Sequence, residues 1–552
     1  MRSISLPLLI AEVFVTSLIA LACGAAETAT PVPTPTAKPA PTATLAPGAP
    51  TPTATIVPTA TKVPQNVPIR GGTLKYAGDR FTSLDPNFSN TFIDRDAMFA
   101  IFDSLVILKP DLSFSPGLAK SWEVSSDGMS VTFKLQEGVK FHDGSEFTAD
   151  VIKKNFAYTM DTKVNSLIRT IIGPYLADIK VVDKYTAVFQ MKNPYRPLLS
   201  DLGIRDGQTL VISAAAVEKL GGGRDGKFGS QPSGAGPFKF VEWVPSDKVV
   251  VERYPDYWQK GKPYLDKVVW LDVPDYTVQL AMIRTGEADV MIKVRSDDIP
   301  LLKRNSDVTV NEFESGRFYG IFLRPDQKPF DNQKLRAAMA YAIDRKSLSD
   351  TIYGGGARPA YIPEGSGWAF NPDIKTYAYD PKKAKQMLTE AGYPNGISIT
   401  YSCGGSASYI QECETIQAML GAVGINANIT LIPANDVFIQ YVAGTAAMID
   451  TYYSPRADPH GRIARVFLST GGGNPGKRAI PGLDDKINYA ATVYDIAKAK
   501  LLYDEIQTII AEDAWVIFKV FTTEYAALSG KVQAYERYGD LNARYVDVWL
   551  KK

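Results

Sequence analysis

The 552-residue sequence is poor in the side chains on which much metal and hydrolytic chemistry depends. It contains two histidines, His142 and His460, and three cysteines. Zinc sites are built from several histidine and cysteine ligands, and a serine hydrolase needs a histidine base beside its nucleophile. This scarcity argues against both kinds of site, and we expect neither a metal site nor another cofactor.

The sequence also lacks a surplus of charge of either sign. It has 60 Lys and Arg against 59 Asp and Glu, which gives a formal net charge of +1. Nucleic-acid binding depends on basic side chains that displace counterions from phosphates, so we expect no nucleic-acid partner. A hydrophobic content of 45% and an aromatic content of 11% are typical of a folded globular protein.

Motifs of catalysis are missing as well. The sequence has no G-x-S-x-G elbow and no H-E-x-x-H pair. The glycine-rich segment 221–227 resembles a phosphate-binding loop, but Phe228 stands where a serine or threonine would bind magnesium. His142 lies in a Phe-His-Asp-Gly turn with no nucleophile marked beside it, which favours a structural histidine. We therefore expect a protein that is not an enzyme.

The N-terminal end reads as a targeting segment. An apolar run that ends at Ala22 predicts a secretory signal peptide over residues 1–22. The small residues around Cys23 resemble a bacterial lipoprotein cleavage site, so we expect Cys23 to carry acyl chains that bind the lipid bilayer. An ordinary signal peptide or an uncleaved membrane anchor is the alternative. In each case the rest of the chain lies outside the cytoplasm.

Residues 23–68 are dominated by proline and threonine after the cysteine. Proline fixes φ and removes a backbone donor, so neither a helix nor a sheet can propagate through such a segment. The composition predicts an extended linker between the membrane and the folded part of the chain.

Cys403 and Cys413 are the two remaining cysteines. Outside the cytoplasm, a spacing of ten positions suggests a disulfide, and the flanking residues read as a strand followed by a helix. A bridge would then staple the turn between them. Two buried thiols are the alternative.

Strand and helix patterns alternate along the rest of the chain. Segment 179–191 predicts a β-hairpin around Asp183-Lys184. Asp380 is a candidate N-cap for a helix with Pro381 in its first position and Gly392 after its end. Isoleucines and leucines between 496 and 510 form one apolar stripe. The fold class is therefore α/β.

Several segments in a fixed order resemble one protein family. They are Ser83–Pro86, Leu118–Val124, Gly138–Gly144, Phe147–Val151, Gly234–Phe238, Tyr254–Trp258 and Leu335–Arg345. Together they resemble the extracellular solute-binding proteins of family 5, the dipeptide-, oligopeptide- and nickel-binding receptors of ABC importers. The resemblance covers nearly the whole chain from about residue 69 to residue 548.

The resemblance implies an α/β fold of the large, type II periplasmic-binding-protein kind. Two lobes are joined by a hinge, and the ligand cleft lies between them. The implied boundaries are 69–311 for lobe 1 with an extra subdomain at about 112–232, 312–512 for lobe 2, and 513–552 for the return to lobe 1.

The resemblance also indicates which residues line the cleft. From lobe 1 they are Arg80, Phe81 and Thr82. From lobe 2 and the hinge they are Asp450, Tyr452, Tyr453, Arg456 and Phe518. Because side chains alternate along a strand, Tyr452 and Tyr453 should not both face the ligand.

The ligand itself is only partly indicated. Oligopeptide binders of this family carry an aspartate for the peptide amine four places before the proline of an Asp-Pro pair, and this chain has Pro455 there. Asp450 or Asp458 would have to replace that anchor. Arg80 and Arg456 suit a ligand with a carboxylate or another anionic group, because guanidinium binds such groups in a bidentate manner.

We therefore expect a lipid-anchored, monomeric receptor in the periplasm or on the outer face of the cell membrane. It captures a peptide or a related small solute and delivers it to an ABC permease. The alternatives are a receptor for a carboxylate-bearing or metal-chelate ligand, and a surface sensor or hydrolase on the same scaffold.

Overall fold

The computed structural model describes residues 67–88, 92–164, 166–203, 209–405, 407–433, 436–454, 456–538 and 541–552. The expected signal peptide, Cys23 and the linker up to residue 66 lie outside the described residues. Among the helices in the described ranges, none combines the length and apolarity that a membrane span requires.

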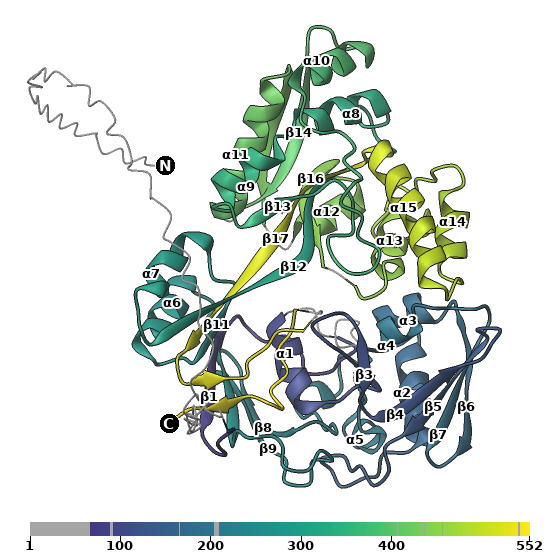
Figure 1. Cartoon of the computed structure of the whole chain (residues 1–552), viewed down its shortest axis with the longest axis vertical. Helices are drawn as coiled ribbons and strands as arrows, with labels where there is room; N and C mark the ends of the chain where they lie inside the picture. The colour runs from purple at the N-terminus through teal and green to yellow at the C-terminus, as the bar shows by residue number, and fades with distance from the viewer. Residues whose placement is uncertain are drawn as a thin grey trace, which may run out of the picture. The chain divides into compact units, whose positions relative to one another are not determined.

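An 11-stranded sheet runs through the compact unit formed by residues 66–552 (Figure 1). Its strand order is β15-β14-β16-β12-β17-β11-β1-β10-β9-β8, and β13 pairs with β17 beside this path. The strands are β1 (Thr73–Gly78), β8 (Phe238–Val244), β9 (Lys248–Arg253), β10 (Lys267–Asp272), β11 (Val290–Ile292), β12 (Val308–Leu323), β13 (Ala357–Pro359), β14 (Ile397–Gly404), β15 (Ile425–Ile432), β16 (Met448–Tyr453) and β17 (Val516–Ser529).

Two long strands, β12 and β17, run through both lobes. On the main path of the sheet, the strands on one side of this pair belong to lobe 1, and those on the other side belong to lobe 2. β12 and β17 pair antiparallel from Val308 opposite Ser529 to Phe322 opposite Val516, with register shifts near their middle. In lobe 1, β17 also pairs with β11 on its other edge. In lobe 2, β12 also pairs with β16 on its other edge. We call β12 and β17 the crossing strands. The two-lobed α/β fold that the sequence predicts is thus confirmed.

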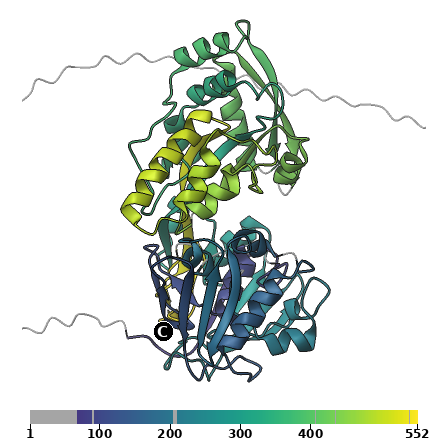
Figure 2. The same cartoon turned by 90° about the vertical axis from the view of Figure 1, so that its right-hand side faces the viewer.

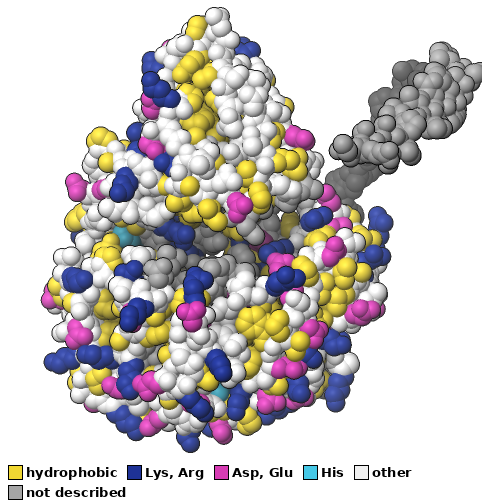
Figure 3. All heavy atoms as spheres, turned by 180° about the vertical axis from the view of Figure 1, so that it is seen from behind, with side chains coloured by type: hydrophobic (Ala, Val, Ile, Leu, Met, Phe, Trp, Pro, Cys, Tyr) yellow, Lys and Arg dark blue, Asp and Glu magenta, His cyan; other side chains and the backbone are white. Residues whose placement is uncertain are grey.

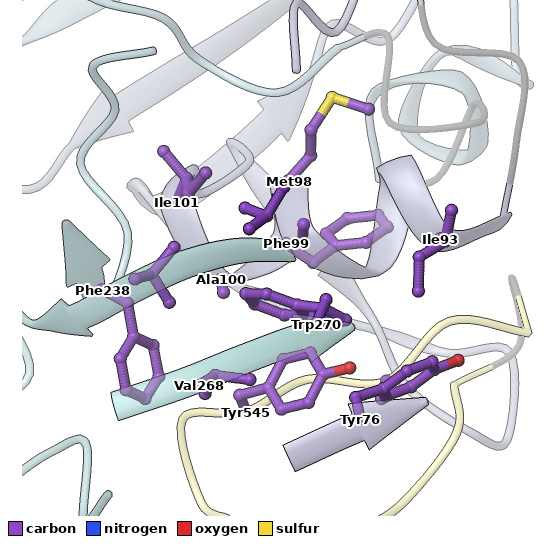
Figure 4. Close-up of a cluster of buried hydrophobic side chains, with 14 of the residues drawn as sticks. Tyr76, Ile93, Met98, Phe99, Ala100, Ile101, Phe238, Val268, Trp270 and Tyr545 are labelled. Carbon is purple, nitrogen blue, oxygen red and sulfur yellow. The ribbon is translucent and has the colours of Figure 1, made fainter. Parts of the chain in front are cut away.

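Lobe 1 is built around a core between helix α1 and the sheet. α1 (Phe92–Ile101) covers β1 and β10, and Trp270 packs edge-on against Tyr545 from the C-terminal segment at a ring distance of 5.4 Å (Figure 4). The other elements of this lobe are β2 (Val106–Leu108), β3 (Phe114–Pro116), α6 (Tyr276–Thr285), α7 (Ile299–Lys303), β18 (Val532–Gln533) and β19 (Trp549–Leu550).

A separate four-stranded sheet, ordered β4-β5-β7-β6, forms a subdomain beside lobe 1. Phe133, Phe156 and Phe189 form the centre of its own core. The expected hairpin at 179–191 is confirmed as β6 and β7. The elements are β4 (Ala119–Val124), β5 (Ser130–Leu135), α2 (Ala149–Met160), α3 (Leu167–Ile172), β6 (Leu176–Asp183), β7 (Thr186–Met191), α4 (Leu198–Gly203) and α5 (Ala214–Leu220).

Lobe 2 has helices on both faces of its sheet (Figures 1 and 2). Ile321 and Leu323 of β12 point to a core shared with α8, α10 and α11, whereas Phe318 and Phe322 point to a core shared with α13, α14 and α15. The helices are α8 (Gln333–Ala342), α9 (Arg345–Ile352), α10 (Pro381–Glu390), α11 (Ala407–Gly421), α12 (Val437–Ala443), α13 (His460–Phe467), α14 (Leu483–Ala490) and α15 (Ile496–Asp513).

Short-range sequence patterns predicted several of these elements correctly. Asp380 caps α10 by accepting a hydrogen bond from the backbone N–H of Lys383, and Pro381 is the first helical residue. A disulfide joins Cys403 at the end of β14 to Cys413 in α11, so the bridge spans the strand–helix turn.

Candidate ligand cleft

The direction of the strands brings the two predicted segments to facing edges of the lobes. β17 enters lobe 1 from lobe 2, and β11 runs antiparallel to it, so the carboxyl end of β11 points toward lobe 2. β1 and β10 are parallel to β11 and end at the same edge. In lobe 2, β16 runs antiparallel to β12, so its carboxyl end points toward lobe 1. Loops at the carboxyl ends of such strands are common binding positions.

A hollow lies between the lobes in the view from behind, with Lys and Arg side chains at its margin (Figure 3). In addition, a cavity of about 960 Å³ lies beside the crossing strands and is lined from both lobes. Lobe 1 contributes Asp111, Tyr535 and Arg537, the crossing strands contribute Glu312 and Glu314, and lobe 2 contributes Gly367.

On the lobe 1 edge, charged side chains follow the ends of three strands. Arg80, after β1, is 65% exposed and approaches Asp272 at the end of β10 with Nε 3.6 Å from Oδ2. Asp79 forms an ion pair of 2.7 Å with Lys293, which follows β11. The exposed guanidinium of Arg80 is therefore only loosely held by its carboxylate.

The other two predicted residues of lobe 1 have different surroundings. Thr82 is exposed, and its backbone N–H donates to Asp94 Oδ1 at 2.9 Å, while its hydroxyl donates to the other oxygen of the same carboxylate. The ring of Phe81 is only 6% exposed and packs edge-on against Trp243 in the core of lobe 1. Phe81 thus lies under the edge, as part of the core.

On the lobe 2 edge, Tyr452 and Tyr453 point to opposite faces of the sheet. Tyr452 is 36% exposed and packs against Tyr319 at a ring distance of 5.2 Å. Tyr453 stacks on Phe318 and Phe322 on the other face. The alternation predicted for this strand is confirmed: Tyr452 lies beside Tyr319 and Arg317, whereas Tyr453 lies beside Phe318, Phe322 and Arg465.

Tyr452 is one of four tyrosines that we call the tyrosine cluster: Tyr319, Tyr353, Tyr409 and Tyr452. Tyr353 lies 6.1 Å from Tyr319, measured between ring centres. Burial is the main cause that raises the pKa of Tyr409, and the groups that add to this rise are Tyr319, Tyr452, Asp450 and Glu412. The Arg317 guanidinium lies 4.6 Å from the centre of the Tyr452 ring, within the range of a cation–π contact.

A buried ionic group lies behind this cluster. The ammonium of Lys519 contacts Glu412 Oε1 at 2.6 Å and also contacts the Asp450 carboxylate. Tyr401 donates a hydrogen bond to Asp450 at 2.9 Å, and Tyr353 donates one to Glu412 at 3.0 Å. Burial raises the pKa of Asp450 to about 6, although Lys519 opposes the rise. Asp450 is only 4% exposed and lies beneath the tyrosine cluster.

Two further predicted residues lie on the opposite face of the lobe 2 sheet. Phe518 is 2% exposed and packs edge-on against Phe318 at 5.0 Å, so it belongs to the core. Arg456 is half-buried near Glu364. Burial raises the pKa of Glu364, and the charges of Arg462 and, less strongly, Arg456 oppose that rise.

Sequence patterns did not indicate the residues that complete the lobe 2 edge. Lys519 lies in the apolar first part of β17, and Arg317 follows polar residues such as Glu314 and Ser315 in β12, so neither side chain gives a periodic pattern of its own. Glu412 shares a helix with exposed Glu414, and only the fold distinguishes them. A lysine within the apolar run at the start of β17 was the available sign, because such a charge is rarely buried without partners.

The subdomain contacts lobe 2 at several points, and Arg196 makes a large share of them. Arg196 forms a bidentate ion pair with Asp458, at 2.8 and 3.0 Å, and both side chains are less than one-tenth exposed. It also donates to the carbonyls of Ala490 and Val493 and stacks over Trp368. Nearby, the Tyr175 hydroxyl lies 3.3 Å from His460 Nε2. We call this the Arg196 contact.

The two lobes are joined by the crossing strands, and loops at the carboxyl ends of strands lie on their facing edges. This is the architecture of a bilobal solute-binding protein. Residues 113–475 match the family model described as bacterial extracellular solute-binding proteins, family 5. The chain belongs to this family, as its sequence motifs predicted. It is accordingly a solute receptor of the kind that serves ABC importers.

Relatives of known sequence and structure agree with this assignment. The chain is 34% identical over 358 residues to the glutathione-binding protein GsiB of Escherichia coli K12, covering 65% of this chain and 69% of GsiB. It is similar to the binding protein DppA from Helicobacter pylori, solved with the peptide STSA, at 26% identity and a TM-score of 0.78, covering 88% and 99% of the two chains. A dipeptide-binding protein from Pseudoalteromonas shares the fold with a TM-score of 0.78 at 24% identity.

Proposed function

We propose that this receptor binds a short peptide, or a related small solute, that carries a free carboxylate. The tyrosine cluster carries the proposal, because it lies where β16 ends toward lobe 1 and combines apolar ring faces with hydroxyl groups. Peptides offer the same mixture of apolar and polar groups, and binding sites for small solutes are typically lined in this way. The relatives named for glutathione and solved with a peptide support the same class of solute.

The carboxylate of the solute would bind to arginine. Arg80 is the candidate on lobe 1, since most of its side chain is exposed and Asp272 holds it only at 3.6 Å. Arg456 is the candidate on lobe 2. Thr82, whose position Asp94 fixes, would add a polar contact beside Arg80. We expect Phe81, Tyr453 and Phe518 to support these residues from the cores.

The cellular role follows from the family and from the N-terminal sequence. We infer that the chain is a monomeric, non-enzymatic receptor held at the cell surface through acylated Cys23 and the Pro/Thr-rich linker, and that its lobes follow the predicted boundaries. Closure of the lobes around the solute would create the surface that the permease recognises. The support is the lipoprotein-like sequence around Cys23 and the extracellular character of the family.

Isothermal titration calorimetry tests the proposal. Glutathione, Met-Leu and Ser-Thr-Ser-Ala would each be titrated into the full chain and into Arg80→Ala, Arg456→Ala and the control Arg304→Ala, an exposed arginine beyond α7. At least one probe should bind, and loss of a carboxylate-binding arginine should weaken it at least about tenfold. Binding that neither arginine variant changes would contradict the anionic subsite.

A further inference from the structure

A second cavity lies within the subdomain. It has a volume of about 620 Å³ and is lined by helix α2, by α3 with the residues that follow it, and by strand β6. All of its lining residues lie between Lys153 and Ile179, so neither lobe 2 nor the crossing strands take part in it. Cavities of roughly 300 to 1,000 Å³ hold small molecules. We call it the subdomain cavity.

Much of the wall of the subdomain cavity is apolar. Phe156 and Met160 lie four positions apart on α2 and therefore share one face of the helix. Phe156 is only 9% exposed, and its ring packs edge-on against Phe189 at 5.0 Å, which anchors this wall in the core of the subdomain. Leu176 and Ile179 of β6 add two further apolar side chains. Such a wall suits the apolar body of a small ligand.

The polar side chains of the cavity carry more positive than negative charge. Arg169 lines the cavity, and its buried Nε has no hydrogen-bond partner. Among the ion pairs of the described residues, none includes Arg169. Lys153 pairs with Asp178 at 3.3 Å, but both side chains are about half exposed, so this pair is weak. Leaving a buried donor unpaired costs about 1–3 kcal/mol, and an anionic acceptor in the cavity would remove that cost.

The edge of β6 favours a small molecule over an extended peptide as the occupant. β6 is the last strand in the order β4-β5-β7-β6 and pairs only with β7 within this sheet (Figure 1). However, the register of that pair shifts between Leu176 and Asp178, directly beside the cavity. Such an irregularity disturbs the even spacing of backbone groups that an added strand would need.

We propose that the subdomain cavity is a second binding site, separate from the ligand cleft, for a monocarboxylate with an apolar body, such as a medium-chain fatty acid. The carboxylate accepts hydrogen bonds from the guanidinium of Arg169, whose planar fork matches it. The apolar body lies against Phe156 and Met160, and Lys153 adds a second positive charge. The inference goes beyond the proposed function, because none of these residues belongs to the cleft between the lobes.

Calorimetry with three probes of equal chain length tests the charge of the ligand. Octanoate, octanol and octylammonium would each be titrated into the full chain. We expect octanoate to bind, and the neutral and cationic probes to bind at least about tenfold more weakly. Octanol that binds as tightly as octanoate, or no binding of octanoate at all, would overturn the inference.

Three variants test the location of the site. Arg169→Ala should weaken octanoate binding at least about tenfold, whereas Lys180→Ala, which removes an exposed lysine of β6 outside the cavity, should leave it unchanged. Ala157→Trp places a ring at an exposed position of the cavity wall on α2 and should block the site without changing the core. Octanoate that binds Arg169→Ala and Ala157→Trp as tightly as the natural chain lies elsewhere, which would overturn the inference. None of these results decides the proposed function, because that function is measured with peptides.

Discussion

His142 is held as a neutral ring by the backbone of segment 234–236. The backbone N–H of Gly234 donates to Nδ1 at 3.4 Å, so Nε2 carries the hydrogen and donates to the carbonyl of Gly236 at 3.0 Å. Burial lowers the pKa of His142 to about 4. The structural role that the sequence favoured for this histidine agrees with these contacts.

This arrangement makes a prediction about stability in acid. Because the folded pKa lies below the ordinary value of 6.5, the stabilisation is complete above about pH 6.5 and is lost as the pH falls through about 4. The full effect is about 3 kcal/mol. Urea unfolding at pH 7.5 and pH 4.5 should show a steeper loss of unfolding free energy for the natural chain than for His142→Gln. Equal losses in the two proteins would contradict this account.

At the residue scale, the predicted site residues divide into two groups. Arg80, Thr82 and Tyr452 have exposed surface at the facing edges of the lobes, whereas Phe81 and Phe518 are core residues. Family resemblance predicts all of them for the cleft. It could not tell which aromatic rings are buried, because an apolar side chain at an edge and one beneath it look the same in a sequence.

At the scale of single elements, short-range signals were sufficient where the structure is local. The cap at Asp380 and the hairpin of β6 and β7 involve residues close in sequence, and both were predicted. The pairing of β12 with β17 joins segments about 200 residues apart, and no local pattern specifies that register. The same is true of Lys519, whose partners come from α11 and β16.

The disulfide between β14 and α11 gives the prediction at this scale. It closes a loop across ten positions, which corresponds to about 2–3 kcal/mol of stabilisation in the chain-entropy account. Cys403→Ala/Cys413→Ala should lower the free energy of unfolding by that amount under oxidising conditions. Under reducing conditions the natural chain should approach the double variant.

Chemical labelling gives an independent check of the same bridge. A thiol-alkylating reagent applied to the denatured, unreduced protein should leave Cys403 and Cys413 unmodified. Labelling of both residues before reduction would contradict the bridge.

At the scale of the whole molecule, the Arg196 contact joins the subdomain to lobe 2. The arginine and Asp458 are both removed from solvent, and the carbonyls of Ala490 and Val493 and the hydroxyl of Tyr503 accept the remaining guanidinium hydrogens. Removing one partner of a buried pair leaves the other charge without compensation, which costs several kcal/mol. The contact thus stabilises the arrangement in which the lobes meet.

Arg196→Ala should therefore favour a more open molecule. Small-angle X-ray scattering should show a larger radius of gyration than for the natural chain, and solute affinity should fall at least about tenfold because the binding-competent form is less populated. Lys192→Ala, which removes an exposed cation from the same segment, is the matched control. An unchanged radius of gyration together with unchanged affinity would show that the contact does not control closure.

The central claim, that the protein is a receptor for a small peptide-like solute, is tested most directly by native mass spectrometry of the full chain. Spectra would be recorded as purified and after addition of glutathione, Met-Leu or Ser-Thr-Ser-Ala. We predict a complex with one intact solute per chain in at least one of these samples, lost when the protein is unfolded. A spectrum of the bare chain alone in every sample, or cleavage of the added peptide, would contradict the claim.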